Sequence, residues 1–258
     1  MMKIRFILNW RDRLKACGIH FVLSLAIAIL AAGLVFGIWY PYPYREISGG
    51  RELFLIVVSV DVILGPLITL TIFNLAKPWH ELKRDLLIVI LIQLAALGYG
   101  LWTVCVARPV HLVFEYDRFR VVHAVDIPVE LLAKAPDDIN TFPLMGPSLL
   151  SLRKFRDNNE MMEATMAALK GLPLSARPDL WQPYAKAIND IRQTAKPVSA
   201  LKARLPAQAS LIDAAIAPTG KKPESLVYVP LVGRKVFWTV FLDPVTADIL
   251  AFAPIDSF

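Results

Sequence analysis

Three long apolar runs dominate the first 107 residues of the chain. Cys17 to Trp39 and Leu86 to Ala107 contain no Asp, Glu, Lys or Arg, and the run from Leu53 to Leu75 is interrupted only by Asp61. A bilayer core of about 30 Å needs roughly 20 apolar helical residues. The pattern therefore predicts three transmembrane helices, and we assign residues 1–107 to a transmembrane domain.

Residues 108–258 carry shorter apolar runs. Apolar side chains alternate along Val110–Tyr116, and a second strand-like run, Phe119–Val125, follows a turn near Asp117-Arg118, which predicts a hairpin of two strands. Three more strands are predicted near the C-terminus: Leu226–Leu231, Val236–Leu242 and Ile249–Phe252.

Helical periodicity occupies the middle of this region. One helix is predicted after Ser148, a candidate N-cap, and ends at Gly171, and a second begins at Asp179 and ends at Lys196-Pro197. Strands followed by helices and again by strands predict an α+β domain over residues 108–258, with an antiparallel sheet covered on one face.

The composition agrees with a membrane protein that has a folded extramembrane part. The chain is 56% hydrophobic and 19% charged, with a mean hydropathy of +0.50. Lys and Arg number five before the first run, two in the first loop and three in the second. This asymmetry predicts a cytoplasmic N-terminus and a C-terminal domain on the far side of the membrane, which is the periplasm in a Gram-negative cell. Nucleic acid is not expected as a partner, because no basic cluster is interleaved with aromatic residues.

No catalytic, cofactor or metal signature is present. The four histidines fall in different regions, and neither a zinc motif nor a nucleophile or nucleotide loop accompanies them. Cys17 and Cys105 are predicted at opposite ends of the helices, too far apart for a disulfide. We therefore expect neither enzymatic activity nor a cofactor.

Two groups of side chains are assigned to ordinary structural roles. Tyr40, Tyr42 and Tyr44 follow the first apolar run, where an aromatic belt at the membrane interface is expected. Met161, Met162 and Met166 recur at helical spacing and are interpreted as core, with an adaptable contact surface as the alternative.

We interpret Asp61 as the one ionisable side chain within the apolar runs. Tyr99 is predicted at a similar depth in the third helix and is its expected hydrogen-bond partner. Gly65-Pro66 follows one turn later and should bend the second helix there. Structural packing is the favoured role for Asp61. A socket for a partner helix comes next, and a proton relay is least favoured.

Gly33 and Gly37 form a GxxxG spacing in the first helix. Such spacing allows another backbone to approach closely. The partner is either another helix of this bundle or the helix of another protein.

Two stretches together resemble the TfpX/TfpZ family of type IV pilin accessory proteins. They are Asp61–Leu70 (DVILGPLITL) and Leu94–Thr103 (LAALGYGLWT), the second continuing through Ala107–Val110 and Val113–Val122. The resemblance implies a multi-pass protein of the inner (plasma) membrane of a Gram-negative bacterium that helps a type IV pilin assemble, remain stable or reach the surface. It implies no enzymatic activity and assigns no functional residues.

The expected partners are a type IV pilin, chiefly the major pilin, the pilus assembly machinery and the lipid bilayer. We expect pilin to be bound in the membrane and in the periplasm. Two alternatives remain open: a membrane-anchored periplasmic enzyme acting on pilin or glycan, and a membrane protein that relays a periplasmic signal.

Overall fold

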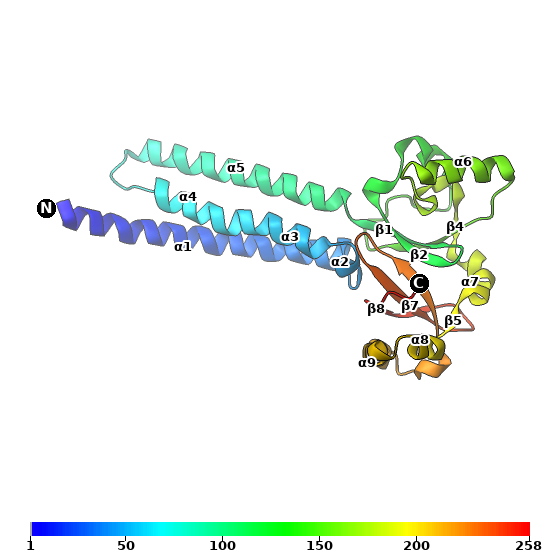
Figure 1. The fold of residues 1–258 in the computed structure, drawn as a ribbon. Coiled ribbons are helices and arrows are strands. Elements are labelled where there is room, and N and C mark those ends of the chain that lie inside the picture. Colours follow the sequence, from blue (N-terminus) through cyan, green and yellow to red (C-terminus); the bar gives the residue numbers. More distant parts are fainter. Residues whose placement is uncertain (1) are drawn as a thin grey trace. The chain divides into compact units, whose positions relative to one another are not determined.

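The chain folds into two compact units in the computed structural model, which describes residues 2–258 and the side chains of residues 10–258 (Figure 1). The helical unit comprises Met1–Ile38 and Gly50–Val106, and the sheet domain comprises Trp39–Gly49 and Ala107–Phe258. The boundary after α5 lies between Val106 and Ala107, one residue before the position expected from the sequence. Residues 39–49, in contrast, were assigned to the transmembrane domain and belong to the sheet domain.

Three long apolar helices form where the sequence predicts them. Their elements are α1 (Met2–Leu34) with the π-helix η1 (Val35–Trp39), then α3 (Gly50–Ser59), the π-helix η2 (Val60–Leu64) and α4 (Gly65–Ile72), and finally α5 (Trp79–Val106). By length and composition, the helices at Trp10–Trp39, Gly50–Ile72 and Trp79–Val106 can each cross a membrane.

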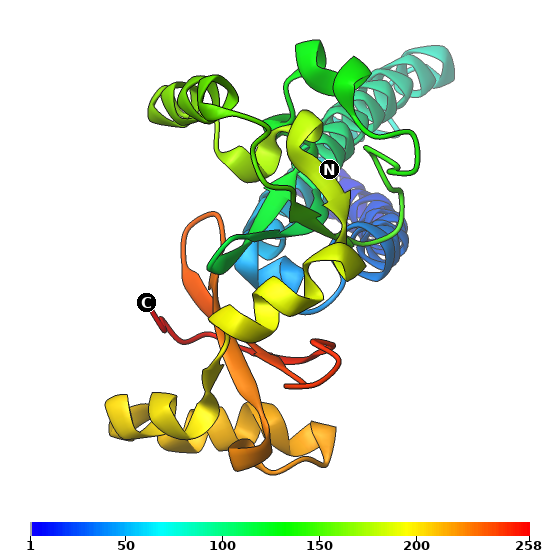
Figure 2. The ribbon, with the colours of Figure 1, turned by 90° about the vertical axis from the view of Figure 1, so that its right-hand side faces the viewer.

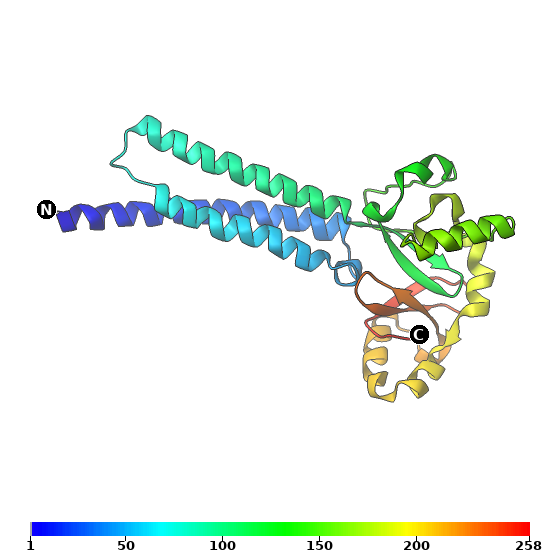
Figure 3. The same ribbon diagram turned by 45° about the horizontal axis from the view of Figure 1, so that its top comes forward.

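The second of these helices lies between the other two. α1 runs beside α4, as Figures 1 and 3 both show, and α5 packs against α3 and α4. A Cβ atom added at Gly100 of α5 would lie 2.5 Å from Cγ1 of Val57 in α3. Only glycine permits this close approach between α3 and α5.

The sheet domain is built on one eight-stranded sheet. Its strands are β1 (Pro109–Glu115), β2 (Arg118–His123), β3 (Ser148–Leu152), β4 (Trp181–Pro183), β5 (Lys196–Pro197), β6 (Val227–Val232), β7 (Phe237–Leu242) and β8 (Ile249–Ala253). The order is β4-β3-β1-β2-β6-β7-β8, and β5 pairs with β6. The predicted β1–β2 hairpin and the three C-terminal strands are confirmed.

The expected antiparallel sheet is wrong, because the sheet is mixed. β3 runs parallel to β1, and β2 runs parallel to β6. Ser148 begins a strand and does not cap a helix. The first long helix of the domain, α6 (Asn158–Leu169), instead begins after Asp157, whose Oδ1 accepts a hydrogen bond from the amide of Glu160 at 2.8 Å. The five residues Ser148–Leu152 (SLLSL) are too few for their pattern to distinguish a strand from the start of a buried helix.

The second predicted helix is also broken into shorter pieces. Between Asp179 and Lys196 the chain forms the end of a 3₁₀ turn, β4, a further 3₁₀ turn and α7 (Ile188–Thr194). Pro183 lies inside the predicted helix, where it removes a backbone donor and clashes with the preceding turn.

The remaining helices of the domain are short. They are α2 (Tyr44–Ile47), α8 (Val198–Arg204), α9 (Ala209–Ile216) and the 3₁₀ turns η3 (Ala124–Asp126), η4 (Val129–Lys134), η5 (Leu174–Ala176), η6 (Pro178–Leu180), η7 (Tyr184–Ala187), η8 (Pro206–Gln208), η9 (Ala217–Thr219) and η10 (Pro223–Ser225). In Figure 2, α8 and α9 lie at one end of the sheet domain and α6 lies toward the other.

Both faces of the sheet are buried, whereas the sequence suggested cover on one face only. Leu112 and Phe114 pack in one core cluster, which includes Ile191 of α7, and Val113 packs in a second cluster with Leu180. A third cluster joins α8 and α9 to β6–β8. Successive side chains of β1 therefore point alternately to two faces of the sheet that are both buried, and not to one buried and one solvent-exposed face.

Residues 39–49 contribute to the first core cluster of the sheet domain. Tyr44 and Ile47 of α2 are buried there, and the Tyr44 ring lies 6.0 Å from that of Phe252 in edge-to-face geometry. Tyr40 is also buried, and only Tyr42 is exposed, at 65%. The prediction of an aromatic belt is therefore wrong for Tyr40 and Tyr44, since burial against a domain selects the same amphipathic residues.

The methionines of α6 are exposed. Met161, Met162 and Met166 face solvent in the sheet domain, and Ala164 is the buried residue of this helix. The interpretation of the methionines as core is wrong, because α6 contacts the domain through a narrow face centred on alanine.

Candidate functional site

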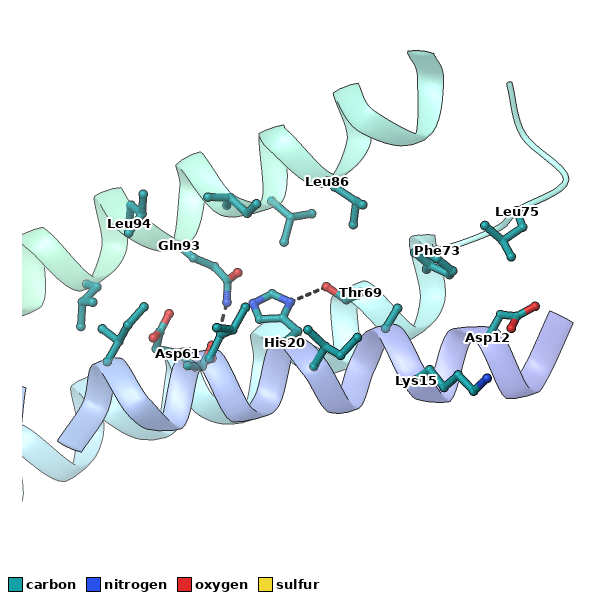
Figure 4. A pocket seen from close by; sticks show the side chains of 18 residues that line it. Asp12, Lys15, His20, Asp61, Thr69, Phe73, Leu75, Leu86, Gln93 and Leu94 are labelled. Atoms are coloured by element: carbon teal, nitrogen blue, oxygen red, sulfur yellow. Dashed lines mark hydrogen bonds between the residues drawn. The ribbon is translucent and has the colours of Figure 1, made fainter. Parts of the chain in front are cut away.

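A groove of about 570 Å³ separates α1 from α5 within the helical unit (Figure 4). Most of its lining is aliphatic, and the second helix contributes through η2 and α4. The polar and charged residues that line it are Asp12, Lys15, His20, Ser24, Asp61, Thr69 and Gln93. The groove thus combines apolar walls with a few polar groups, as small-molecule and helix-binding sites do.

His20 and Thr69 connect α1 to α4 inside the groove. Nδ1 of His20 lies 2.6 Å from Oγ1 of Thr69, and Thr69 is buried. Asp61 is close enough to His20 for an electrostatic interaction. Asp61 is therefore not the only ionisable group among the apolar helices. The signal was available, because His20 lies within the charge-free run that follows Cys17.

Gln93 of α5 compensates for the proline in the second helix. Pro66 has no N–H, so the carbonyl group one turn earlier in the helix has no backbone donor. In a π-helical turn the hydrogen bond spans five residues, and the carbonyl group without a donor is therefore that of Asp61. Nε2 of Gln93 lies 3.4 Å from that oxygen and donates to it. A Cβ atom added at Gly65 would lie 1.7 Å from Nε2 of Gln93, so glycine leaves room for the amide. The distortion expected at Gly65-Pro66 is present as the π-helical turn η2, which directly precedes Gly65.

Tyr99 does not hydrogen bond to Asp61 among the described residues. Both line a second groove, of about 480 Å³, between α5 and the second helix. The Tyr99 side chain is nevertheless 69% exposed, and its ring lies 5.8 Å from that of Trp102. Matching depth was the basis of the prediction. Successive residues of a helix are also rotated by about 100° about the helix axis. In α5 this rotation places Gly100, and not Tyr99, on the side that faces the second helix.

Gly33 and Gly37 do not pack against another helix. A Cβ atom at either position would have no neighbour within 4 Å outside the local helix backbone. Gly37 also lies in η1, the π-helical end of the first helix. The sequence left two partners open for these glycines, a helix of this bundle or the helix of another protein. In the described part of the chain, no helix of this bundle packs against them.

His111 is fully buried at the start of β1 in the sheet domain. Its Nδ1 lies 2.7 Å from Oγ of Ser148, its Nε2 lies 3.0 Å from the carbonyl oxygen of Thr141, and its ring contacts that of Trp181. Desolvation by burial lowers the pKa of His111 to about 4, opposed by the hydrogen bond to Thr141.

His123 has a separate partner, Asp126, at 2.9 Å. The two histidines of the hairpin therefore serve different local structures. Among the residues that the structure describes, no group of three or more His, Cys, Asp or Glu side chains is placed to hold a metal ion.

Comparison with known proteins gives consistent matches to fimbrial assembly proteins. Residues 8–49 match the family described as Fimbrial assembly protein FimB, a segment that covers most of α1, η1 and residues 39–49. The fimbrial assembly proteins of serogroups I and E1 of Dichelobacter nodosus are 37% and 36% identical to the chain over 246 residues, which is 95% of the chain and of each relative.

A third relative matches over a shorter region. The fimbrial assembly protein of serogroups C1 and C2 of the same organism is 44% identical over 121 residues, 47% of the chain and 92% of that protein. No solved structure is significantly similar to the chain. Because the first two similarities extend over almost the whole length of both proteins, the chain belongs to the family of fimbrial assembly proteins.

Proposed function

We propose that this protein is an inner-membrane accessory protein that assists the assembly, stability or surface display of a type IV pilin. The similarity to fimbrial assembly proteins over 95% of the chain carries the proposal. The three apolar helices support insertion into the membrane. The excess of Lys and Arg in the N-terminal tail and second loop favours a cytoplasmic N-terminus and a periplasmic sheet domain.

We further propose that the protein acts by binding pilin, without catalysis. A type IV pilin waiting in the membrane presents one apolar helix and a periplasmic head, so a partner needs a surface for each. The open face at Gly33 and Gly37 suits the helix, since small residues let two backbones approach closely. The groove that contains His20, Asp61 and Gln93 offers polar groups to the same partner.

The first test compares sheared surface pilus with total cellular pilin in the native host, with and without this gene. We expect surface pilus to fall when the gene is removed. If membrane pilin persists, the protein acts in assembly or display, and if both fall together, it protects pilin from degradation. Unchanged amounts of both would contradict the proposal.

Pilin binding at the glycines makes a sharper prediction. A photo-crosslinking residue at the exposed Leu30, one turn from Gly33, should capture pilin in the native chain. In the variant G33L/G37L, we expect about tenfold less crosslinking, because leucine side chains keep the two helix backbones apart; a tenfold loss corresponds to about 1.4 kcal/mol. Crosslinking is measured relative to the amount of accessory protein in the membrane.

The control for this experiment is Gly18→Leu. Gly18 lies in the same helix and also has no neighbour within 4 Å of an added Cβ atom, so the substitution adds one of the two leucine side chains at another position on α1. Equal crosslinking in native, G18L and G33L/G37L proteins would exclude docking at the glycines while leaving the broader role in assembly intact.

A further inference from the structure

Large apolar side chains are exposed in two loop regions of the sheet domain: Val125 and Val129 in the region of 3₁₀ turns after β2, and Phe142, Leu144 and Met145 in the loop before β3. The second loop is unusual in composition, because residues 139–152 contain no charged side chain. Met145 lies outside the strands and helices of the domain and is 78% exposed. The sheet domain does not cover these side chains.

The sheet topology brings both loops to one end of the domain. β1 begins at Pro109, directly after the chain leaves α5 at Val106. Since β3 is parallel to β1, with Ser148 opposite His111, the loop before β3 lies at the starting end of β1. β2 is antiparallel to β1, so the residues after β2 lie at that end too. A hydrogen bond of 3.0 Å from the amide of Ala124 to the carbonyl of Arg108 fixes their position.

The segment that follows the first helix reaches the same loop. Pro41 comes two residues after η1 ends at Trp39, and its Cγ would lie 3.4 Å from a Cβ atom on Gly146. His111 holds both ends of the loop through Thr141 and Ser148. The apolar loop is therefore anchored beside the residues at which the chain enters the sheet domain, both after α1 and after α5.

We propose that the loop at Leu144-Met145, together with Val125 and Val129, inserts into the interfacial layer of the bilayer leaflet that faces the sheet domain. The proposal rests on membrane insertion of the helical unit. From Val106 to Pro109 the chain spans at most about 11 Å, so this end of the domain stays near the membrane surface. Apolar side chains of interfacial segments reach about 5–10 Å into the headgroup and acyl boundary.

The chemistry of the loop favours lipid over a protein partner. The uncharged stretch offers no electrostatic specificity, and the binding energy would come from burial of apolar area next to a surface to which the chain is already tethered. Insertion should therefore occur with zwitterionic phosphatidylcholine alone, without pilin and without anionic lipid.

The test uses the full chain in nanodiscs of phosphatidylcholine, with Cys17 and Cys105 replaced by serine. An environment-sensitive fluorophore is attached in turn to M145C, M162C and I92C. Met162 is the matched control, since it is also an exposed methionine, at 68%, but lies in α6, beyond the opposite end of β3. Ile92 is an exposed residue of α5 and reports whether the helical unit is inserted.

We expect lipids brominated near the headgroup end of the acyl chain to quench the probe at 145 at least about twofold more than the probe at 162, given insertion to interfacial depth. Quenching at 92 but equal, weak quenching at 145 and 162 would overturn the proposal. A response at 145 only after pilin is added would also overturn it and assign the loop to a protein contact. No quenching at 92 would contradict membrane insertion itself, which is part of the proposed function and of this proposal.

Discussion

Ile47→Ala is expected to lower the free energy of unfolding of the sheet domain by about 2–5 kcal/mol, the usual loss for a fully buried isoleucine. Ile47 is 1% exposed and belongs to the first core cluster, although the second and third apolar helices separate it in sequence from β1. The turn between β6 and β7 closes over it, because a Cβ atom on Gly233 would lie 2.7 Å from Cγ2 of Ile47. Urea-dependent proteolysis of the full chain in detergent micelles measures the change.

The matched control is Arg45→Ala in the same short helix. Arg45 forms an exposed ion pair with Glu46 at 3.7 Å, and such pairs contribute between 0 and about 1 kcal/mol. Equal loss of stability in both variants would show that α2 is not part of the core. The expected difference also implies that a fragment starting at residue 107 lacks part of its own core and unfolds at a lower urea concentration than the full chain.

The apolar helices and most strands were predictable because their signals are local. Charge-free runs of more than 20 residues have one plausible structure, and the strands near the C-terminus have clear turns after Gly233 and at Asp243-Pro244. The contribution of Tyr44 and Ile47 to a distant core was not predictable, since no local pattern records which surface a short segment between two apolar helices packs against.

The pairing of the strands depends on contacts distant in sequence. The β1–β3 and β2–β6 pairs are parallel and require long crossover connections, which carry no turn signature. The apolar run at Ser148–Leu152 was assigned to a helix for a related reason: it is short, and apolar residues at helical spacing follow it closely.

The candidate site was predicted in part. Asp61, Gly65 and the turn before Pro66 do lie together, because they are neighbours in one helix. His20 and Gln93 were not connected to them, although a polar residue inside an apolar helix is itself a signal of an internal contact. Tyr99 was paired with Asp61 only because the two residues were expected at a similar depth in the membrane. The sequence does not give the rotation of each helix about its axis, so two residues at the same depth can still point away from each other.

Acid is expected to destabilise the sheet domain through His111. The pKa of His111 is lowered from its ordinary 6.5 to about 4 by burial, so the unfolded chain binds a proton more readily than the folded chain. Stability is therefore complete above pH 6.5 and falls as the pH drops toward 4. The shift corresponds to about 3 kcal/mol over this window. Urea unfolding of the full chain at several pH values between 7 and 4 measures the slope.

His111→Asn isolates this contribution, because asparagine keeps hydrogen-bonding groups near Ser148 and Thr141 but does not titrate. The variant should be less stable than the native protein at pH 7 and should lose less stability on acidification, so that the two curves converge by about 3 kcal/mol. Parallel curves would contradict the assignment. The carbonyl of Thr141 and the hydroxyl of Ser148 both accept hydrogen bonds from an imidazolium ion, so the lost stability comes from burying the charge rather than from breaking these contacts.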